Sequence, residues 1–149
     1  MVALARQIAA AHGLAPEIVC AVIDRESSWQ TWATRYEPKF MSKYIAPLYV
    51  GGKLTATEAY TRAMSFGLMQ IMAQTAREFG FLGPFLAELC DPPIGIEWGC
   101  CKLADCFKRT KGNLPEALEM YNGGSNEEYA TEVILLARNY KTAAPTKNA

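Results

Sequence analysis

The chain has 149 residues, of which half are hydrophobic and a fifth are charged. This size and composition are typical of a globular protein with one core, so we expect residues 1–149 to form a single domain. The 15 basic and 15 acidic side chains give a formal net charge of zero. That balance argues against binding to nucleic acid or to an anionic membrane surface. No apolar run reaches the roughly 20 residues that span a bilayer, so membrane insertion is not expected.

The first segment, Met1 to Leu14, has Arg6 as its one fixed charge, and polar residues interrupt its apolar positions. It lacks the charged start and clean apolar run of a signal peptide, so we expect synthesis in the cytoplasm. Its apolar spacing instead predicts a short helix from Ala3 to His12, which ends at Gly13.

The second predicted helix begins at Pro16, a residue that suits the first helical turn. Val19, Val22 and Ile23 share one face, and Glu26 continues that row. A carboxyl group carried towards the core has a raised pKa, because burial disfavours its charged form. Glu26 is therefore a candidate general acid near neutral pH. Taken alone, the stretch is also typical of an ordinary glutamate at the end of a helix.

The stretch from Trp29 to Phe40 has no helical period but is rich in aromatic residues, and Pro38 lies within it. We interpret it as a wrapped loop. Aromatic rings with polar edges beside a carboxylate suit sugar binding, although core packing explains them as well. Glu37 lies in this loop and is the best candidate for a second carboxylate, because Asp24 points about 200° round the helix from Glu26.

The rest of the chain predicts further helices and no convincing strand. The expected helical segments are Met41–Tyr49 (ended by Pro47 and Gly51), Thr55–Ala63, Gln74–Phe79, Pro84–Leu89, Ile94–Thr110, Asn113–Tyr121 and Tyr129–Tyr140. Capping boxes begin two of them, at Thr55 to Glu58 and at Ser125 to Glu128. A frayed tail is expected from about residue 142. The fold class is therefore mainly α, with short helices that cross irregularly.

Five cysteines leave at least one thiol unpaired in a monomer. Cys100, Cys101 and Cys106 fall on one predicted helix and point in different directions, which makes pairing among them poor. A zinc site needs CxxC-like spacing or histidines, and the single histidine, His12, is distant in the sequence. We therefore expect free thiols in a reducing compartment, no metal site and no cofactor.

Three stretches, taken in order, resemble the lytic transglycosylase and goose-type lysozyme superfamily, which cleaves bacterial peptidoglycan. They are Glu26-Ser27-Ser28-Trp29, the run Ser65-Phe66-Gly67-Leu68-Met69-Gln70-Ile71-Met72, and Tyr121-Asn122-Gly123-Gly124 with Tyr129-Ala130. The resemblance covers most of residues 15 to 140 and implies a compact lysozyme-like helical domain with a substrate groove. The stretch between Trp29 and Ser65 is longer than in many members of the superfamily, and the part from Trp32 to Pro38 looks like phage-borne members of the endolysin kind.

Carried over residue by residue, the resemblance makes Glu26 the catalytic acid. It also implies substrate-binding roles for Ser65, Met69, Gln70, Tyr121, Asn122 and Tyr129. Among these, Tyr129 would orient the Glu26 carboxyl or the substrate's N-acetyl group, and Met69 would pack beside the groove. Plain core packing also explains both of them.

The expected activity is cleavage of the β-1,4 bond between N-acetylmuramic acid and N-acetylglucosamine. In the transglycosylase route, which the motifs favour, one glutamate acts as acid and then as base, and the sugar's own 6-hydroxyl closes a 1,6-anhydro ring. A hydrolytic muramidase with Glu26 and Glu37 as its two carboxylates is the alternative. A glycan-binding module without activity is a further alternative. We expect a monomer whose partner is the peptidoglycan strand, reached after release from the cytoplasm.

Overall fold

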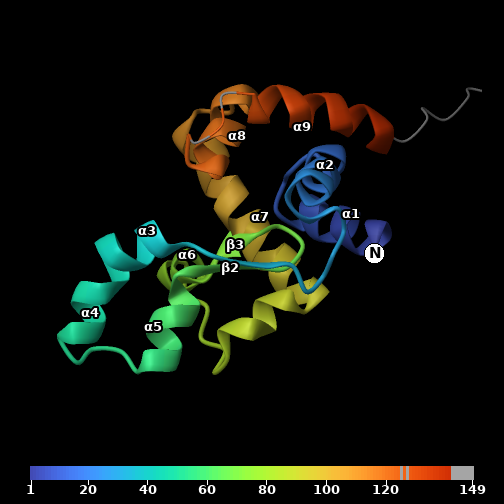
Figure 1. Cartoon of the computed structure of the whole chain (residues 1–149). Coiled ribbons are helices and arrows are strands. Elements are labelled where there is room, and N and C mark those ends of the chain that lie inside the picture. Colours follow the sequence, from blue (N-terminus) through green and yellow to red (C-terminus); the bar gives the residue numbers. More distant parts are fainter. Residues whose placement is uncertain (125, 127, 142–149) are drawn as a thin grey trace, which may run out of the picture.

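The structure is a computed structural model that describes residues 1–124, 126 and 128–141. Helices dominate it (Figure 1). The α-helices are α1 (Val2–Ala11), α2 (Pro16–Ser27), α3 (Pro38–Phe40), α4 (Ala46–Val50), α5 (Ala56–Arg62), α6 (Ala73–Glu78), α7 (Pro92–Arg109), α8 (Leu114–Asn122) and α9 (Tyr129–Ala137). The other helical segments are the π-helical turn η1 (Met41–Ile45) and the 3₁₀ helices η2 (Leu86–Cys90) and η3 (Arg138–Tyr140). The fold class expected from the sequence is confirmed.

The main core forms around α2, which packs between α1 and α9 (Figure 1). Helix α7 lies across the middle of the molecule and packs against α8. All residues from Ile18 to Ile23 are buried, so α2 is surrounded on every side in this part. A helix that is apolar all round belongs inside a core. Glu26 follows this buried stretch by less than one turn, and the fold therefore holds its carboxyl near the interior.

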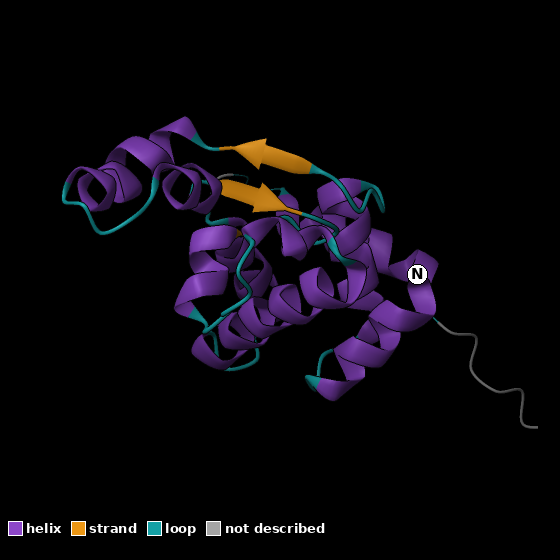
Figure 2. Cartoon of the chain, turned by 90° about the horizontal axis from the view of Figure 1, so that it is seen from below, coloured by secondary structure: helices purple, strands orange, loops and turns teal. Residues whose placement is uncertain are grey.

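The prediction that the chain contains no strand is wrong. Three short strands, β1 (Thr34–Tyr36), β2 (Met64–Phe66) and β3 (Ile71–Met72), form an antiparallel sheet in the order β1-β2-β3. Arg35 pairs with Ser65, and Ser65 pairs with Met72 on its other side. Figure 2 shows the strands along one edge of the helices. Strands of two or three residues are too short to produce a visible alternation in the sequence.

Pro47 was expected to end a helix, yet the helical segment continues from α3 through η1 and α4 as far as Val50. The amide of Ala46 donates to the carbonyl oxygen of Met41, five residues earlier, so the hydrogen-bond register widens immediately before the proline. Pro47 lacks an N–H group, and a π turn at this point accommodates that loss. The segment ends at Gly51, as the second of the two predicted terminators requires.

Several other expectations are confirmed. Thr55 caps α5 and Asn113 caps α8 through side-chain bonds to the amides of Glu58 and Glu116. All five cysteines are free. The second capping box runs from Ser125 to Glu128, and its first residue, Ser125, lies outside the described residues, as does the tail from residue 142. Glu128 immediately precedes α9 and its side chain makes no capping bond. Among the helices that the structure describes, none has the length and apolar character to cross a membrane.

Candidate active site

Glu26 lies in the last turn of α2, where the helix is closed by an abrupt change of backbone conformation. Ser28 and Trp29 both adopt left-handed backbone angles, with φ of 48° and 64°, and turn the chain towards β1. The hydroxyl of Ser27 donates to the carbonyl oxygen of Leu68 at 2.8 Å. This bond ties the end of α2 to the turn between β2 and β3, so Glu26 is held against that turn.

The Glu26 carboxyl is half-buried and accepts a hydrogen bond of 2.6 Å from the hydroxyl of Tyr129, the first residue of α9. Burial raises the pKa of Glu26; the hydrogen bond from Tyr129 and the charges of Lys102, Arg35 and Arg25 oppose this rise without cancelling it. Burial and the neighbouring carboxyl raise the pKa of Tyr129 well above its ordinary value, so its hydroxyl keeps its proton as a donor.

The turn between β2 and β3 forms one wall of the site. Gly67 has a φ of +70°, and a Cβ atom there would collide with the backbone of Leu89. Only glycine fits both the conformation and the space. The Ser65 hydroxyl donates to the side-chain oxygen of Gln70 at 2.9 Å, and the Gln70 amide donates to the carbonyl oxygens of Ala33 and Gly67, each at 2.9 Å. Ser65 and Gln70 therefore fix the shape of this wall.

The last turn of α8 provides the facing wall. The Tyr121 hydroxyl donates to the carbonyl oxygen of Met69 at 2.7 Å, which joins α8 to the turn. Lys102 of α7 donates to the carbonyl oxygen of Tyr121 at 2.6 Å, and its ammonium lies 4.2 Å from the centre of the Tyr121 ring. Burial lowers the pKa of Lys102.

Lys102 is a site residue that our sequence analysis missed. It lies three residues after Gly99 and four before Cys106, both of which are buried. This spacing puts it on the face of α7 that packs inward. A lysine on an apolar helical row is therefore the signal in the sequence that could have identified it.

The arrangement forms a small pocket of about 80 Å³, lined by Glu26, Arg35, Ser65, Gln70, Met72, Lys102, Tyr121 and Asn122. Five of the residues singled out from the sequence thus come together around one space. Tyr129 contacts Glu26 without lining the pocket. Met69 is fully buried and its side chain packs directly on Gly99 of α7. It therefore anchors the turn between β2 and β3 to α7 and does not line the pocket.

Glu37 is not among the residues that line the pocket. It follows β1, two residues after Arg35, so the two side chains lie on the same side of an extended chain. The Arg35 guanidinium forms an ion pair of 2.6 Å with the Glu37 carboxylate. Arg35 therefore interacts with both carboxyl groups. It lines the pocket that contains Glu26, and it forms an ion pair with Glu37.

The family model of the Transglycosylase SLT domain matches residues 3–133. The chain belongs to this family. Neither a curated protein nor a solved structure matches the chain in the corresponding comparisons. The SLT domain is that of a lytic transglycosylase-type enzyme, which cleaves the glycan strands of peptidoglycan. The matched range includes every element that contributes to the pocket.

A larger hollow of about 680 Å³ lies elsewhere on this SLT domain, between α5 and α6. Two carboxylates, Glu58 and Glu78, are among the residues that line it. Glu58 forms ion pairs of 2.8 Å with Arg62 and 2.9 Å with Arg77. Burial alone would raise the pKa of Glu58, but these two arginines together lower it. Glu58 therefore stays ionised, whereas burial raises the pKa of Glu26 in the smaller pocket.

One group of residues that can hold a metal ion lies apart from the pocket. The sequence separation of His12 from the cysteines argues against a shared site, and that prediction is wrong. His12, Glu97 and Cys101 lie together where the end of α1 meets α7. His12 and Glu97 are 85 positions apart in the sequence, and this separation conceals their proximity.

Proposed function

We propose that this SLT domain cleaves the β-1,4 bond between N-acetylmuramic acid and N-acetylglucosamine, with Glu26 as the general acid. The observation that carries this proposal is the Glu26 carboxyl itself: half-buried, with a raised pKa, and oriented by Tyr129 in a polar pocket. A carboxyl group in this condition keeps its proton at a higher pH than one in water and can donate it to a leaving oxygen.

We further propose the transglycosylase route. Glu26 gives its proton to the glycosidic oxygen as the bond from C1 of the muramic acid breaks, and the substrate's N-acetyl group stabilises the positive charge at C1. The Glu26 carboxylate then takes the proton of the 6-hydroxyl as that oxygen bonds to C1, which yields a 1,6-anhydro end. The charges of Lys102 and Arg35, together with the Tyr129 hydroxyl, stabilise the ionised form that acts in the second step.

The position of Glu37 supports this route over hydrolysis. An inverting hydrolase needs a free carboxylate about 6.5–9.5 Å from the acid to activate a water. Glu37 is instead engaged by Arg35 and does not line the pocket. Hydrolysis with Glu37 as the base is the second candidate, since Arg35 connects it to the pocket wall.

The test is a turbidity assay on a peptidoglycan suspension with mass spectrometry of the released muropeptides. Anhydro ends, lighter by one water than reducing ends, are expected from the native protein, and Glu26→Gln should lose about 10²–10⁴-fold in rate while staying folded. Glu17→Gln, on the same helix but outside the pocket, is the matched control and should keep its rate. A native protein that binds peptidoglycan without releasing fragments would overturn the proposal in favour of a binding module.

We also propose a bacteriolytic role of the endolysin kind, with the enzyme made in the cytoplasm and acting as a monomer on the cell wall after release. Its support is the stretch around residues 32–38, which looks like phage-borne members and which forms β1 beside the pocket. Lysis of cells whose wall is exposed to the added protein, compared with Glu26→Gln, tests this role.

A further inference from the structure

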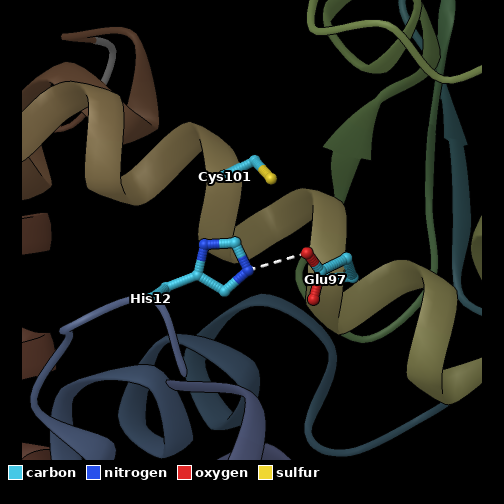
Figure 3. A group of neighbouring side chains, drawn as sticks. All are labelled: His12, Glu97 and Cys101. Carbon is cyan, nitrogen blue, oxygen red and sulfur yellow. Dashed lines mark hydrogen bonds and ion pairs between the residues drawn. The ribbon is translucent and has the colours of Figure 1, made fainter. Parts of the chain in front are cut away.

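Three side chains of different chemistry converge at the junction of α1 and α7. His12 Nε2 lies 2.8 Å from Glu97 Oε1, and the ligand atoms of His12, Glu97 and Cys101 all lie within 4.8 Å of one another. Figure 3 shows the His12 ring facing both α7 side chains, which come from neighbouring turns of that helix. This group lies outside the catalytic pocket and is independent of the proposed reaction.

The fold holds these residues in place before any ligand arrives. His12 ends α1, and its amide donates to the carbonyl oxygens of Ile8 and Ala9. Its side chain is 19% exposed. Glu97 and Cys101 are four residues apart on α7, the spacing that aligns side chains on one helical face. A site built on two packed helices loses little freedom when it binds an ion.

We infer that His12, Glu97 and Cys101 form a binding site for a divalent transition metal ion, best suited to Zn²⁺ with water as its fourth ligand. Imidazole nitrogen, carboxylate oxygen and thiolate sulfur are the donors that Zn²⁺ takes, and a thiolate selects against Mg²⁺ and Ca²⁺. One thiolate and one carboxylate balance the charge of the ion. Zinc bonds of about 2.0–2.3 Å place tetrahedral ligand atoms about 3.3–3.8 Å apart. This range lies between the 2.8 Å from His12 Nε2 to Glu97 Oε1 and the 4.8 Å within which all three ligand atoms lie.

The environment of the three residues allows an ion to enter and the ligands to adjust. The Glu97 side chain is 48% exposed, so its carboxylate can move by the fraction of an ångström that separates a hydrogen bond from coordination. Cys101 is only half-buried, whereas Cys20, Cys90, Cys100 and Cys106 are buried. An ion bound here joins the end of α1 to α7, so its effect should be on stability rather than on the rate of cleavage.

The experiment uses the full chain, without an affinity tag, reduced and freed of metal with a chelator. Titration with Co²⁺ should saturate at one ion per chain, with a near-ultraviolet band from thiolate coordination and visible bands of tetrahedral geometry. Zn²⁺ should displace the Co²⁺ and abolish these bands. Zn²⁺ should also raise the Tm by several degrees at concentrations about a hundredfold above its Kd.

Cys101→Ser should abolish the thiolate band, and His12→Gln should weaken Co²⁺ binding at least about tenfold, as even loss of a residue that supports a ligand does. Glu97→Gln, which removes the carboxylate ligand, should also weaken Co²⁺ binding. Glu119→Gln, at an exposed glutamate on α8, is its matched control and should bind like the native chain. Circular dichroism checks that each variant is folded, and His12→Gln gives a second reading should Cys101→Ser be unstable. Absence of saturable Co²⁺ binding would overturn the inference. So would His12→Gln and Cys101→Ser variants that bind Co²⁺ as tightly as the native chain, and the cluster would then be a histidine–glutamate hydrogen bond beside a free thiol.

Discussion

The hydroxyl of Tyr129 donates a 2.6 Å hydrogen bond to Oε1 of Glu26, across 103 residues of sequence. The first turn of α9 thereby meets the last turn of α2 at the carboxyl group. Burial favours the protonated form of this carboxyl, and the Tyr129 hydroxyl favours its ionised form. The pKa of Glu26 is the balance of these effects, and each can be changed separately by substitution.

Tyr129→Phe should move the basic limb of the pH profile of kcat/KM to higher pH. Removing the hydroxyl takes away a hydrogen bond that stabilises the ionised carboxylate, so the pKa of Glu26 rises. The carboxyl group then stays protonated to a higher pH. The rate at the optimum should fall about 10–100-fold, because the carboxyl is no longer oriented. The profile is measured by initial rates on soluble glycan-strand fragments.

Tyr140→Phe is the control for this substitution, since the Tyr140 hydroxyl bonds to Asp24 and Trp29 rather than to Glu26. Its basic limb should coincide with that of the native enzyme. If the basic limb of Tyr129→Phe also coincides with that of the native enzyme, the Tyr129 hydroxyl does not affect the pKa of Glu26.

Lys102→Met should shift the basic limb in the same direction for a different reason. The positive charge of Lys102 favours the ionised form of Glu26, so its loss raises the pKa of that carboxyl. Lys108→Met removes an exposed lysine from the same helix and should leave the profile unchanged. A limb that moves to lower pH in Lys102→Met would contradict the assignment of Lys102 to the electrostatics of Glu26.

The residues that could be identified from the sequence are those whose signal is local. The apolar face of α2 and the carboxylate at its end follow from helical spacing, which makes Glu26 a candidate acid. The resemblance of its motif to the family then singles it out as the catalytic one. Lys102 was missed because charged residues on a helix are usually assigned to solvent, although its spacing from Gly99 was informative. The meeting of His12 with Cys101 depends on how α1 packs against α7, which no local pattern encodes.

The short sheet shows the same limit in the backbone. β1 is held by pairing with a distant segment, as Arg35 with Ser65, and β2 and β3 pair with each other across a short turn. The side chains of β1 are exposed, so no buried alternating face marks it in the sequence. The sheet depends on pairing between strands, which leaves little trace in residues 34–36, 64–66 and 71–72 themselves. The helices are largely predictable from apolar spacing and caps.

The effect of Glu26→Gln on stability should depend on pH. Glu26 has an ordinary pKa of 4.5 in the unfolded chain and a higher one in the folded protein. As pH rises through this window the unfolded chain releases its proton first, so the native protein loses stability. The glutamine variant does not titrate, and its advantage over the native chain should grow through the window and then level off.

This advantage is measured by urea unfolding of both proteins from pH 4 to pH 8. A pKa difference of one unit between the folded and unfolded states corresponds to about 1.4 kcal/mol, which such curves resolve. A stability difference that is constant with pH would mean that burial does not perturb the Glu26 carboxyl.

A reductant should leave the Tm almost unchanged, because all five cysteines are free. A native disulfide contributes about 2–4 kcal/mol, so its reduction would lower the Tm by several degrees. Titration of thiols in denaturant, before and after reduction, should find the same five groups. A lower number before reduction would reveal a disulfide that the folded chain in this structure does not contain.

Glu37→Gln distinguishes the two reaction routes. The Glu37 carboxylate is paired with Arg35 at 2.6 Å and lies outside the lining of the pocket, so its expected role is to hold the end of β1. The substitution should leave anhydro products at a near-native rate, with a modest loss of stability because an exposed ion pair contributes about 0–1 kcal/mol. Glu116→Gln, an exposed glutamate on α8, serves as the matched control. Native products with reducing ends that disappear in Glu37→Gln would make Glu37 the base that activates water. The enzyme would then be a hydrolase with two carboxylates, and the single-glutamate mechanism would be excluded.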